Sequence, residues 1–356
     1  MTTQTRIHCY AANAKSIYIP QIFREITDRY APVLGKDAWP VKAIKRLRRG
    51  EDVLIHIHWE EFILSGCTTP EDAHAAAGRF EAQMRAFRDL GGKTAWTVHN
   101  LLPHNMLHIE AFLRIRRFLA GFSDAVLVHN ACAVPMLAGQ VELDPAKVHV
   151  VPCPAFTGWY ETKAEAEASI GAAADRTLLC FGAVRRQKGF GRLIDMLPAD
   201  YLADRGATIR VSGAGPEADL VRSAHAHRGD VAWDLRYVPT EEVPGLIRGS
   251  ACVVLPYEVF LTSGMALLVM SVGGLLVAAD APQFREILPE ESTRFLYRGD
   301  DASDLQRVID EVLALAPAER AAICRANYEA AQRFDPKLIG DKLDACYRGL
   351  GARAAA

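Results

Sequence analysis

Two loops in the second half of the sequence carry residue types that suit the binding of a diphosphate. The loop 182–189 follows an apolar strand and precedes a helix, and it holds Arg185 and Lys188. Two cations beside a helix N-terminus can stabilise the charge that develops on a leaving diphosphate. In the second loop, Ser263 and Gly264 open an apolar helix, whose free N–H groups form an anion site. A solvated basic loop and an ordinary strand–helix–strand unit are the alternatives that these residues leave open.

Titratable side chains follow two strands in the first half. The segment HIHWEEFIL places His58 and Glu61 after one strand, and TVHNLLPHN places His99 and His104 after the next. Such strand ends meet at one edge of a parallel sheet, where α/β proteins bind ligands. Burying so many titratable groups without a purpose is costly, which favours function over structure. These histidines, with His56, could be metal ligands, but no helical HExxH spacing supports zinc, so we expect no metal.

The elements that position these residues alternate between strands and helices. Strands are predicted at 6–10, 52–58, 94–98, 125–128, 148–151, 178–181, 208–212, 235–238, 253–255 and 275–279. Helices are predicted at 17–30, 70–90, 109–122, 191–197, 217–226, 241–248, 264–272 and over much of 302–349. This order indicates an α/β protein with two doubly wound parallel, Rossmann-like sheets whose strand-end loops face an interdomain cleft. The predicted domains are 1–155 and 156–335, and we expect the helix in 336–356 to cross back to the first.

The segment PYEVFLTSGMALLVMSVGGLLVAA resembles the donor-binding segment of GT-B glycosyltransferases, in which a Pro-Tyr loop and a Ser-Gly helix start face a sugar nucleotide. Retaining members carry two glutamates eight positions apart, and Phe260 and Leu268 stand at those positions. The chain is more similar to the xanthan-type β-mannosyltransferases, whose His-Trp-x-Glu and His-Asn-x-x-Pro-His motifs occur here in the same order. It departs from them at Glu60, which replaces a proline, at Asn105, which replaces a glutamate, and at 152–154, which lacks a His-Gly.

The resemblance implies an acceptor-binding first domain and a nucleotide-sugar-binding second domain. The residues that it assigns to the donor are Arg185, Lys188, Gly213, Tyr237, Val238, Tyr257, Ser263, Gly264 and Glu286, although a surface glutamate is an alternative for the last. Those that it assigns to the acceptor are His58, Trp59, Asn100 and His104. An inverting transfer needs a catalytic base, and Glu61 and His99 are the candidates. We favour Glu61, because a carboxylate is charged at neutral pH without tuning.

The function implied by the resemblance is transfer of mannose from GDP-mannose, with inversion and a β-linked product. The implied acceptor is a lipid-diphosphate-linked oligosaccharide in bacterial exopolysaccharide biosynthesis, and no metal or other cofactor is expected. Three alternatives remain. One is a retaining GT-B transferase that uses a UDP-sugar, another is an epimerase or phosphorylase on the same fold, and the last is a non-enzymatic two-domain α/β ligand-binding protein.

Composition places this activity in the cytoplasm. The net charge of −2 over 356 residues argues against a nucleic-acid partner. None of the eight cysteines forms a C-x-x-C pair, which indicates reduced thiols. The N-terminus lacks the apolar core of a signal peptide, and no window reaches the ~20 apolar residues of a membrane span.

Two basic clusters interleave with apolar residues, and they indicate either a solvated helix face or peripheral contact with anionic lipid at the inner face of the cell membrane. The clusters are Lys42, Lys45, Arg46, Arg48 and Arg49, and Arg114, Arg116 and Arg117.

Overall fold

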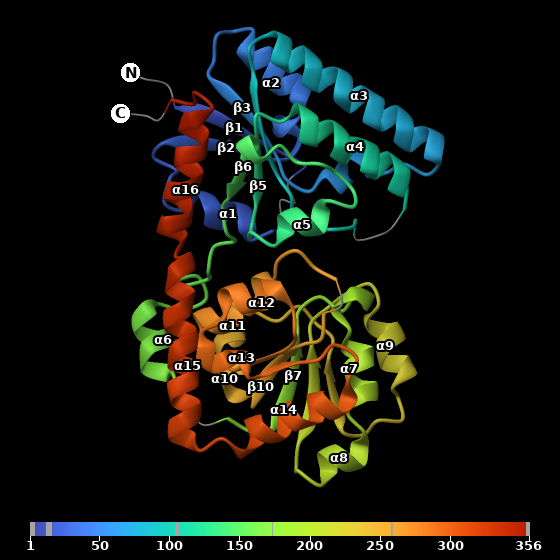
Figure 1. Ribbon diagram of the computed structural model, residues 1–356, viewed down its shortest axis with the longest axis vertical. Coiled ribbons are helices and arrows are strands. Elements are labelled where there is room, and N and C mark those ends of the chain that lie inside the picture. Colours follow the sequence, from blue (N-terminus) through green and yellow to red (C-terminus); the bar gives the residue numbers. More distant parts are fainter. Residues whose placement is uncertain (1–3, 12–15, 104–106, 173, 258, 354–356) are drawn as a thin grey trace. The chain divides into compact units, whose positions relative to one another are not determined.

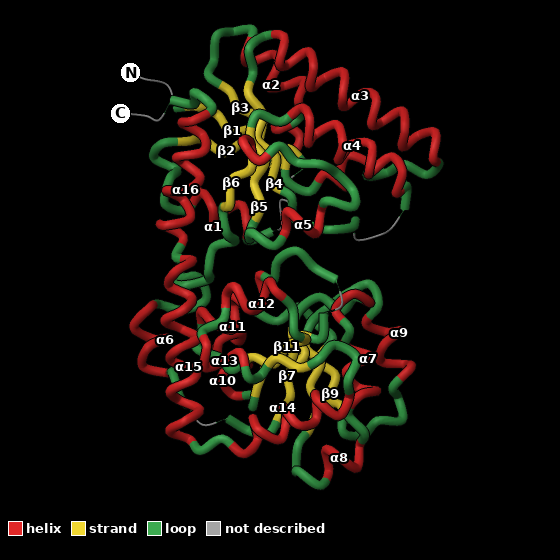
Figure 2. The backbone as a smooth tube through the Cα atoms, viewed as in Figure 1, coloured by secondary structure: helices red, strands yellow, loops and turns green. Residues whose placement is uncertain are grey.

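The computed structural model describes residues 4–11, 16–103, 107–172, 174–257 and 259–353. The chain divides into two compact units, here called unit 1 (residues 1–154 and 336–356) and unit 2 (residues 155–335). Each unit is built around one six-stranded sheet, which is yellow in Figure 2. Every strand pairing in the described part of the chain is parallel, so the predicted α/β class with two parallel sheets is confirmed.

The sheet of unit 1 has the strand order β2-β1-β3-β4-β5-β6. Its strands are β1 (Thr5–Tyr10), β2 (Tyr30–Val33), β3 (Val53–Ile57), β4 (Lys93–Thr97), β5 (Ala125–Val128) and β6 (Val148–Val150). Strands β3 and β5 are buried along their whole length, as expected for parallel strands that are covered on both faces. Because the strands run parallel, the residues that follow β3, β4, β5 and β6 all lie at one edge of the sheet.

Helices cover both faces of this sheet (Figure 1). One face packs against α1 (Tyr18–Phe23) and α16 (Pro336–Gly349), whose apolar side chains join those of β1 in one buried cluster. The other face carries α2 (Pro40–Leu47), α3 (Pro70–Asp89) and α4 (Ile109–Phe122). The shorter elements of unit 1 are α5 (Ala133–Leu137) and the 3₁₀ turns η1 (Gly35–Ala38), η2 (Glu60–Leu64) and η3 (Pro145–Lys147).

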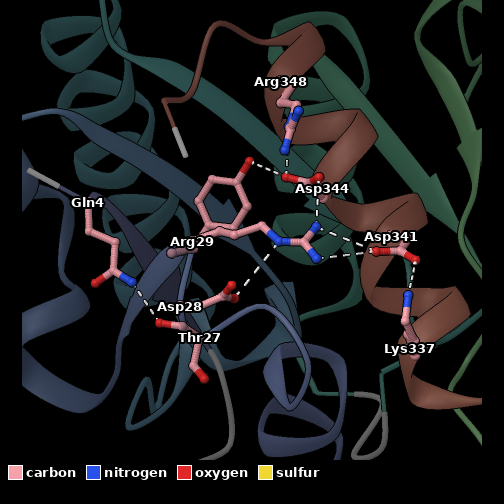
Figure 3. A network of polar contacts seen from close by, with 9 residues as sticks. Gln4, Thr27, Asp28, Arg29, Lys337, Asp341, Asp344 and Arg348 are labelled. Carbon is pink, nitrogen blue, oxygen red and sulfur yellow. Dashed lines mark hydrogen bonds and ion pairs between the residues drawn. The ribbon is translucent and has the colours of Figure 1, made fainter. Parts of the chain in front are cut away.

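A polar network fixes α16 to the start of β2 (Figure 3). Tyr30 Oη donates to Asp344 Oδ1 at 2.7 Å, and Arg29 Nη1 donates to Asp344 Oδ2 at 2.9 Å. On the helix itself, Arg348 Nε donates to Asp344 Oδ1 at 3.1 Å. The last helix of the chain is therefore part of unit 1, although the whole of unit 2 separates it in sequence from the other elements of that unit.

The sheet of unit 2 has the strand order β12-β11-β10-β7-β8-β9. Its strands are β7 (Thr177–Phe181), β8 (Thr208–Ser212), β9 (Val231–Asp234), β10 (Cys252–Leu255), β11 (Leu276–Ala279) and β12 (Leu296–Tyr297). Two buried apolar clusters contain the side chains of these strands, one shared with α7, α9 and α14 and the other with α10, α11 and α12. The helices and turns of unit 2 are α6 (Lys163–Ser169), η4 (Arg186–Lys188), α7 (Phe190–Met196), α8 (Ala199–Ala203), α9 (Ala218–Ala224), η5 (Thr240–Glu242), α10 (Val243–Gly249), α11 (Gly264–Ser271), α12 (Pro282–Ile287), α13 (Glu290–Thr293), α14 (Ala302–Ala314), α15 (Pro317–Ala331) and η6 (Gln332–Phe334).

Two predicted elements were wrong. The segment 17–30 is not one helix, because α1 ends at Phe23 and Tyr30 begins the edge strand β2. Pro32 made that strand hard to predict, since proline is tolerated only where a strand lacks a neighbour on one side. The strand predicted at 235–238 lies four residues earlier, as β9. Residues 235–239 instead form the irregular connection to η5.

Candidate functional site

The loops after β7, β8 and β10 of unit 2 lie in direct backbone contact. Gly213 has a φ of +139°, and a Cβ at this position would lie 2.1 Å from the carbonyl oxygen of Gly182. Gly189 has a φ of +67°, and a Cβ there would lie 2.2 Å from the carbonyl oxygen of Pro256. Only glycine allows approaches as close as these without strain. These two glycines therefore allow the backbones of the three strand-end loops to lie against one another as one surface.

Lys188 and Tyr257 meet on this surface. The Nζ atom of Lys188 lies 3.9 Å from the centroid of the Tyr257 ring, which is a cation–π distance. Arg185 directly precedes η4 and is half-buried, so both predicted cations lie in the same short turn. Arg192 on α7 also contributes, because its Nη2 atom donates to the carbonyl oxygen of Pro256 at 2.8 Å. This arginine ties the loop after β10 to α7, and sequence reasoning did not single it out.

The predicted Ser-Gly helix start is present. Ser263 is the N-cap of α11, and its Oγ atom accepts a hydrogen bond from the N–H of Ala266 at 3.1 Å. The N–H groups of Gly264 and Met265, at the first two helical positions, are then the ones that an anion would use. A Cβ at Gly264 would meet Phe156 at 4.0 Å and nothing closer, so there is room beside the start of this helix.

The two positions at which the resemblance to retaining GT-B enzymes would place glutamates are apolar in the structure as well as in the sequence. The Phe260 ring packs against Phe284 at 4.7 Å and against Tyr257 at 5.6 Å between centroids. Leu268 is buried inside the apolar cluster of α11. Neither side chain can accept a hydrogen bond from a sugar or ribose hydroxyl, so the grip on the donor that paired glutamates provide is missing at these two positions.

The remaining predicted donor residues are dispersed over unit 2. The Tyr237 side chain is 77% exposed, whereas Val238 is buried in the apolar cluster that includes α10. A buried valine can offer a ligand only its backbone groups. Glu286 lies on the exposed side of α12. The structure thus brings Lys188 and Tyr257 together with the loops around them.

In unit 1, Glu61 and Asn100 come together from the ends of adjacent strands. Glu61 lies in η2, directly after β3, and Asn100 follows β4. The Nδ2 atom of Asn100 donates to Glu61 Oε1 at 2.8 Å. Burial, together with the neighbouring Glu60 carboxylate, raises the pKa of Glu61 to about 7. A carboxyl group with a pKa near the operating pH is well suited to act as a general base.

Glu60 and Arg116 form a buried ion pair beneath Glu61. Arg116 Nε and Nη2 donate to Glu60 Oε1 at 3.0 and 2.5 Å, and both side chains are excluded from water. Arg116 also donates to the carbonyl oxygens of Asn100 and Leu101, at 2.7 and 2.6 Å. One guanidinium group therefore fixes η2 and the loop after β4 to each other, and with them the Glu61–Asn100 pair.

The structure corrects the second basic cluster predicted from the sequence. Arg116 was expected on a solvated or lipid-facing helix side, but it is completely buried because its charge is matched by Glu60. Arg114 is half-buried and forms a two-bond ion pair with Glu81 on α3, at 2.8 and 3.0 Å. Only Arg117 is exposed, so α4 carries no basic patch.

Replacing Arg116 by methionine is expected to destabilise unit 1 by about 3–5 kcal/mol, because the charge of Glu60 would remain buried without a partner. Urea denaturation monitored by tryptophan fluorescence measures the change. The matched control is the double variant Arg116→Met with Glu60→Gln, which removes both charges and should recover part of the loss. A single variant as stable as the wild type would show that the ion pair does not position the loops.

Three histidines form a continuous chain along the same sheet edge. His58 Nδ1 lies 3.2 Å from His99 Nε2, and His99 Nδ1 lies 3.2 Å from His129 Nε2. His129 Nδ1 lies 3.0 Å from the carbonyl oxygen of Val151. The three histidines are here called the histidine chain. His58, His129 and Val151 directly follow β3, β5 and β6, and His99 lies two residues after the end of β4. Both ring nitrogens of His99 are thus bonded to other imidazoles, which leaves neither of them for direct contact with a substrate in this structure.

Aromatic rings enclose the histidine chain. Trp59 stacks on His99 with a centroid distance of 4.2 Å and an interplanar angle of 14°. Tyr18 presents its edge to His58, His99 and His129, at 5.9, 4.8 and 5.4 Å between centroids. Burial, followed by the neighbouring imidazoles, lowers the pKa of His58 and His99 well below the usual value. All the rings are therefore neutral near pH 7.

The sequence did not reveal all of these residues. Glu60, Arg116 and Tyr18 were not predicted as parts of the site, and nothing in their local spacing distinguishes them. His129 carried one signal, because His129-Asn130 repeats the His99-Asn100 pair at the next strand end. The predicted acceptor residue His104 lies outside the described residues. Within the described ranges, no group of three or more histidine, cysteine or acidic side chains could hold a metal ion, and no helix is long and apolar enough to cross a bilayer.

One family model matches the chain. Residues 175–314 match the family described as "Glycosyl transferases group 1". The matched stretch lies inside unit 2 and includes the loops of Lys188, Gly213 and Tyr257, together with the start of α11. None of the curated protein sequences compared with this chain matches it.

Solved structures resemble the chain over nearly its whole length. HepE from Anabaena in complex with UDP has a TM-score of 0.69 and 15% identity, and the likeness covers 98% of this chain and 100% of that chain. Sucrose-phosphate synthase from Thermosynechococcus elongatus has a TM-score of 0.68 and 16% identity, with the same coverage. The α,α-trehalose 6-phosphate synthase from Burkholderia multivorans has a TM-score of 0.63 and 12% identity over 94% of this chain and 82% of that one. These likenesses confirm the predicted GT-B fold.

Proposed function

We propose that this chain, a glycosyltransferase of the GT-B fold, transfers a sugar from a nucleotide diphosphate sugar to an acceptor hydroxyl with inversion, and that Glu61 is the general base. The observation that carries the proposal is the state of Glu61, which is bonded to Asn100 and has its pKa raised to about 7 by burial and by Glu60. The apolar residues Phe260 and Leu268 support it, because the carboxylates typical of the retaining group are absent at these two positions.

In the proposed reaction, Glu61 takes the proton of the acceptor hydroxyl as its oxygen attacks the anomeric carbon. The bond between that carbon and the diphosphate oxygen breaks, and the electron pair leaves with the nucleotide diphosphate. Arg185, Lys188 and the N-terminus of α11 stabilise the negative charge that develops there. His99 is then not the base, since both its ring nitrogens are engaged by other imidazoles.

We propose GDP-mannose as the donor, on the resemblance of the His-Trp-x-Glu, His-Asn-x-x-Pro-His and Pro-Tyr…Ser-Gly segments to xanthan-type β-mannosyltransferases. A UDP-sugar is the second candidate, because HepE has been solved in complex with UDP and with UDP-glucose. Calorimetric titration with a panel of UDP- and GDP-sugars tests both donors. We expect binding of GDP-mannose in preference to the UDP-sugars. If no nucleotide or nucleotide sugar bound, the proposed function would be rejected.

Replacing either Arg185 or Lys188 by alanine is expected to lower turnover by about 10²-fold and to weaken diphosphate binding, because charge-assisted bonds to the leaving group strengthen in the transition state. Steady-state transfer rates and GDP affinity measure the two effects. The matched control is Arg222→Ala, which removes an exposed arginine from α9 of the same unit. Wild-type turnover in both loop variants would place the diphosphate elsewhere.

We further propose that the acceptor is a lipid-diphosphate-linked oligosaccharide of exopolysaccharide assembly, reached at the inner face of the cell membrane. The support lies in and around α2, where four basic side chains are exposed and Trp39, the N-cap residue, is 54% exposed. The exposed basic residues are Lys42, Lys45, Arg48 and Arg49. Cationic side chains with an exposed tryptophan suit the surface of an anionic bilayer. Arg46 is set apart from them by its ion pair with Glu51 at 2.9 Å.

Replacing Lys42, Lys45, Arg48 and Arg49 together by glutamate is expected to abolish sedimentation with phosphatidylglycerol vesicles. The fold should survive, because exposed substitutions each change stability by about ±0.5 kcal/mol. The companion variant Trp39→Ala keeps every charge and should weaken vesicle binding less. Equal sedimentation of the wild type and the fourfold variant would identify α2 as an ordinary solvated helix.

A further inference from the structure

The hydrogen-bonding order of the histidine chain is determined by its last member. The carbonyl oxygen of Val151 can only accept a hydrogen bond, so the Nδ1 atom of His129 must carry the proton that points to it. In a neutral imidazole the other nitrogen is then an acceptor. His129 Nε2 therefore accepts from His99 Nδ1, and His99 Nε2 in turn accepts from His58 Nδ1. The same tautomer is imposed on all three rings.

This order leaves an unshared lone pair at the opposite end of the chain. His58 Nε2 is buried and has no hydrogen-bond partner among the residues that the structure describes. A buried acceptor without a partner is costly, and a donor that reaches it recovers that cost. His58 directly follows β3, at the carboxyl edge where parallel α/β sheets bind ligands, and it is three residues from Glu61.

His56 shows what a purely structural histidine looks like in the same strand. Its Nδ1 atom lies 2.7 Å from Tyr347 Oη, and its Nε2 atom lies 2.7 Å from Thr97 Oγ1. Both nitrogens are thus satisfied inside unit 1. The ring of His58 lies 4.1 Å away between centroids, tilted by 33°, and is satisfied on one side only. His8 in β1 is also buried with unpartnered ring nitrogens, so what distinguishes His58 is its place at the open end of a hydrogen-bonded series of rings beside Glu61.

We propose that the histidine chain presents the lone pair of His58 Nε2 to a hydroxyl group of the sugar acceptor, and that His129 is a positioning residue that sets this polarity through His99. The proposal rests on the proposed sugar transfer, since it names the group that receives a second acceptor hydroxyl beside the one deprotonated by Glu61. The centroids of the Tyr18 and Trp59 rings lie 5.9 and 5.8 Å from that of His58, so these two side chains are aromatic neighbours of its ring.

The lowered pKa values of the histidine rings support the role of His58 Nε2 as a hydrogen-bond acceptor. Burial, followed by the imidazoles of His56, His99 and His129, lowers the pKa of His58, and burial lowers that of His129 to about 4. The groups that face the chain are imidazoles, the phenol of Tyr18 and the indole of Trp59, and its far end meets a backbone carbonyl. A neutral ring can accept a hydroxyl hydrogen, whereas a protonated one could only donate.

The direction of the hydrogen bonds, and with it the tautomer of each ring, is tested directly in the wild-type protein. The measurement is a long-range ¹H–¹⁵N correlation spectrum of selectively labelled histidines at neutral pH. We expect the Nδ1–H tautomer for His58, His99 and His129. Finding His58 or His99 in the Nε2–H tautomer or in the charged form would overturn the proposal, and this measurement requires no substitution.

Variants of His129 test whether it sets the polarity of the other rings. His129→Gln retains one donor and one acceptor, so His58 should keep its Nδ1–H tautomer. His129→Phe removes the acceptor while keeping a ring, so His99 and His58 should populate the Nε2–H form. An unchanged His58 tautomer in a folded His129→Phe protein would overturn the role of His129. If that variant did not fold, loss of the Nδ1–H form in His129→Gln would overturn it instead.

The sugar contact is tested by titrating the labelled protein with methyl α-D-mannopyranoside and octyl β-D-glucopyranoside. We expect the Nε2 resonance of His58 to shift on addition of either glycoside and those of His56 to remain. No shift of His58 Nε2 up to the solubility limit of both probes would overturn the contact. The two proposals fail through different results. Absence of nucleotide-sugar binding in calorimetry rejects the proposed function. Donor binding together with a proton on His58 Nε2 rejects only the proposed role of the histidine chain.

Discussion

Replacing Glu61 by glutamine is expected to lower sugar transfer by about 10²- to 10⁴-fold and to leave nucleotide-sugar binding intact. Glutamine keeps the shape of the side chain and its bond to Asn100, but it cannot take a proton from the acceptor hydroxyl. Steady-state transfer assays and calorimetry with the donor separate the two effects. The matched control is Glu81→Gln, which removes an equal charge from the ion pair between α3 and α4 of the same unit.

The pH dependence of transfer follows from the same residue. Because burial and Glu60 raise the pKa of Glu61 to about 7, the basic form of Glu61 is lost as the pH falls through 7. We therefore expect kcat/KM to rise with pH up to about 7 and to level off above it. The limb at low pH should disappear in Glu61→Gln. A rate that increases as the pH is lowered below 7, or an E61Q variant that retains wild-type turnover, would exclude Glu61 as the base.

Acidification is expected to destabilise unit 1 strongly. Burial lowers the pKa of His8 and His129 to about 4 and that of His56 to about 3, and it lowers those of His58 and His99 well below 6.5. These rings stay neutral in the folded chain while they take up protons in the unfolded chain. Their folded pKa values are depressed, so stability is greatest above pH 6.5 and is lost as the pH falls from 6.5 towards 4.

The expected loss is about 1.4 kcal/mol per pH unit for each buried histidine in this window. Urea denaturation at a series of pH values measures it, with the fluorescence of Trp59 and Trp96 among the reporters of unit 1. In His129→Gln the slope of the unfolding free energy against pH should fall by the amount that one buried histidine contributes. A free energy of unfolding that stays constant between pH 6.5 and 4.5 would contradict the burial of these rings.

Much of the fold could be predicted from the sequence because its signals are local. The helix predicted at 109–122 is found as α4, and that predicted at 70–90 ends one residue earlier, at Asp89. In the second of these, Thr69 accepts a hydrogen bond from the N–H of Asp72, so the start signal read from the sequence is a physical cap. Strand β2 was missed because it is short, contains Pro32 and pairs with only one neighbour.

The candidate site was less predictable, because its residues act through contacts between separate strands. The sequence placed Glu61 and Asn100 after different strands, and it could not show that one side chain donates to the other. Arg116 was misassigned to a basic surface, since the sequence carries no sign that Glu60, 56 positions earlier, is its buried partner. His99 was a candidate base until its two nitrogens were seen to bond to other imidazoles.

The central claim is that transfer inverts the anomeric centre with Glu61 as the base. The most direct test is the anomeric configuration of the product formed from an α-linked nucleotide sugar, determined by NMR from the coupling constants of the new glycosidic linkage. The account predicts a β-linked product. An α-linked product would contradict it, because retention in this fold requires no protein base and would leave Glu61 without its assigned role.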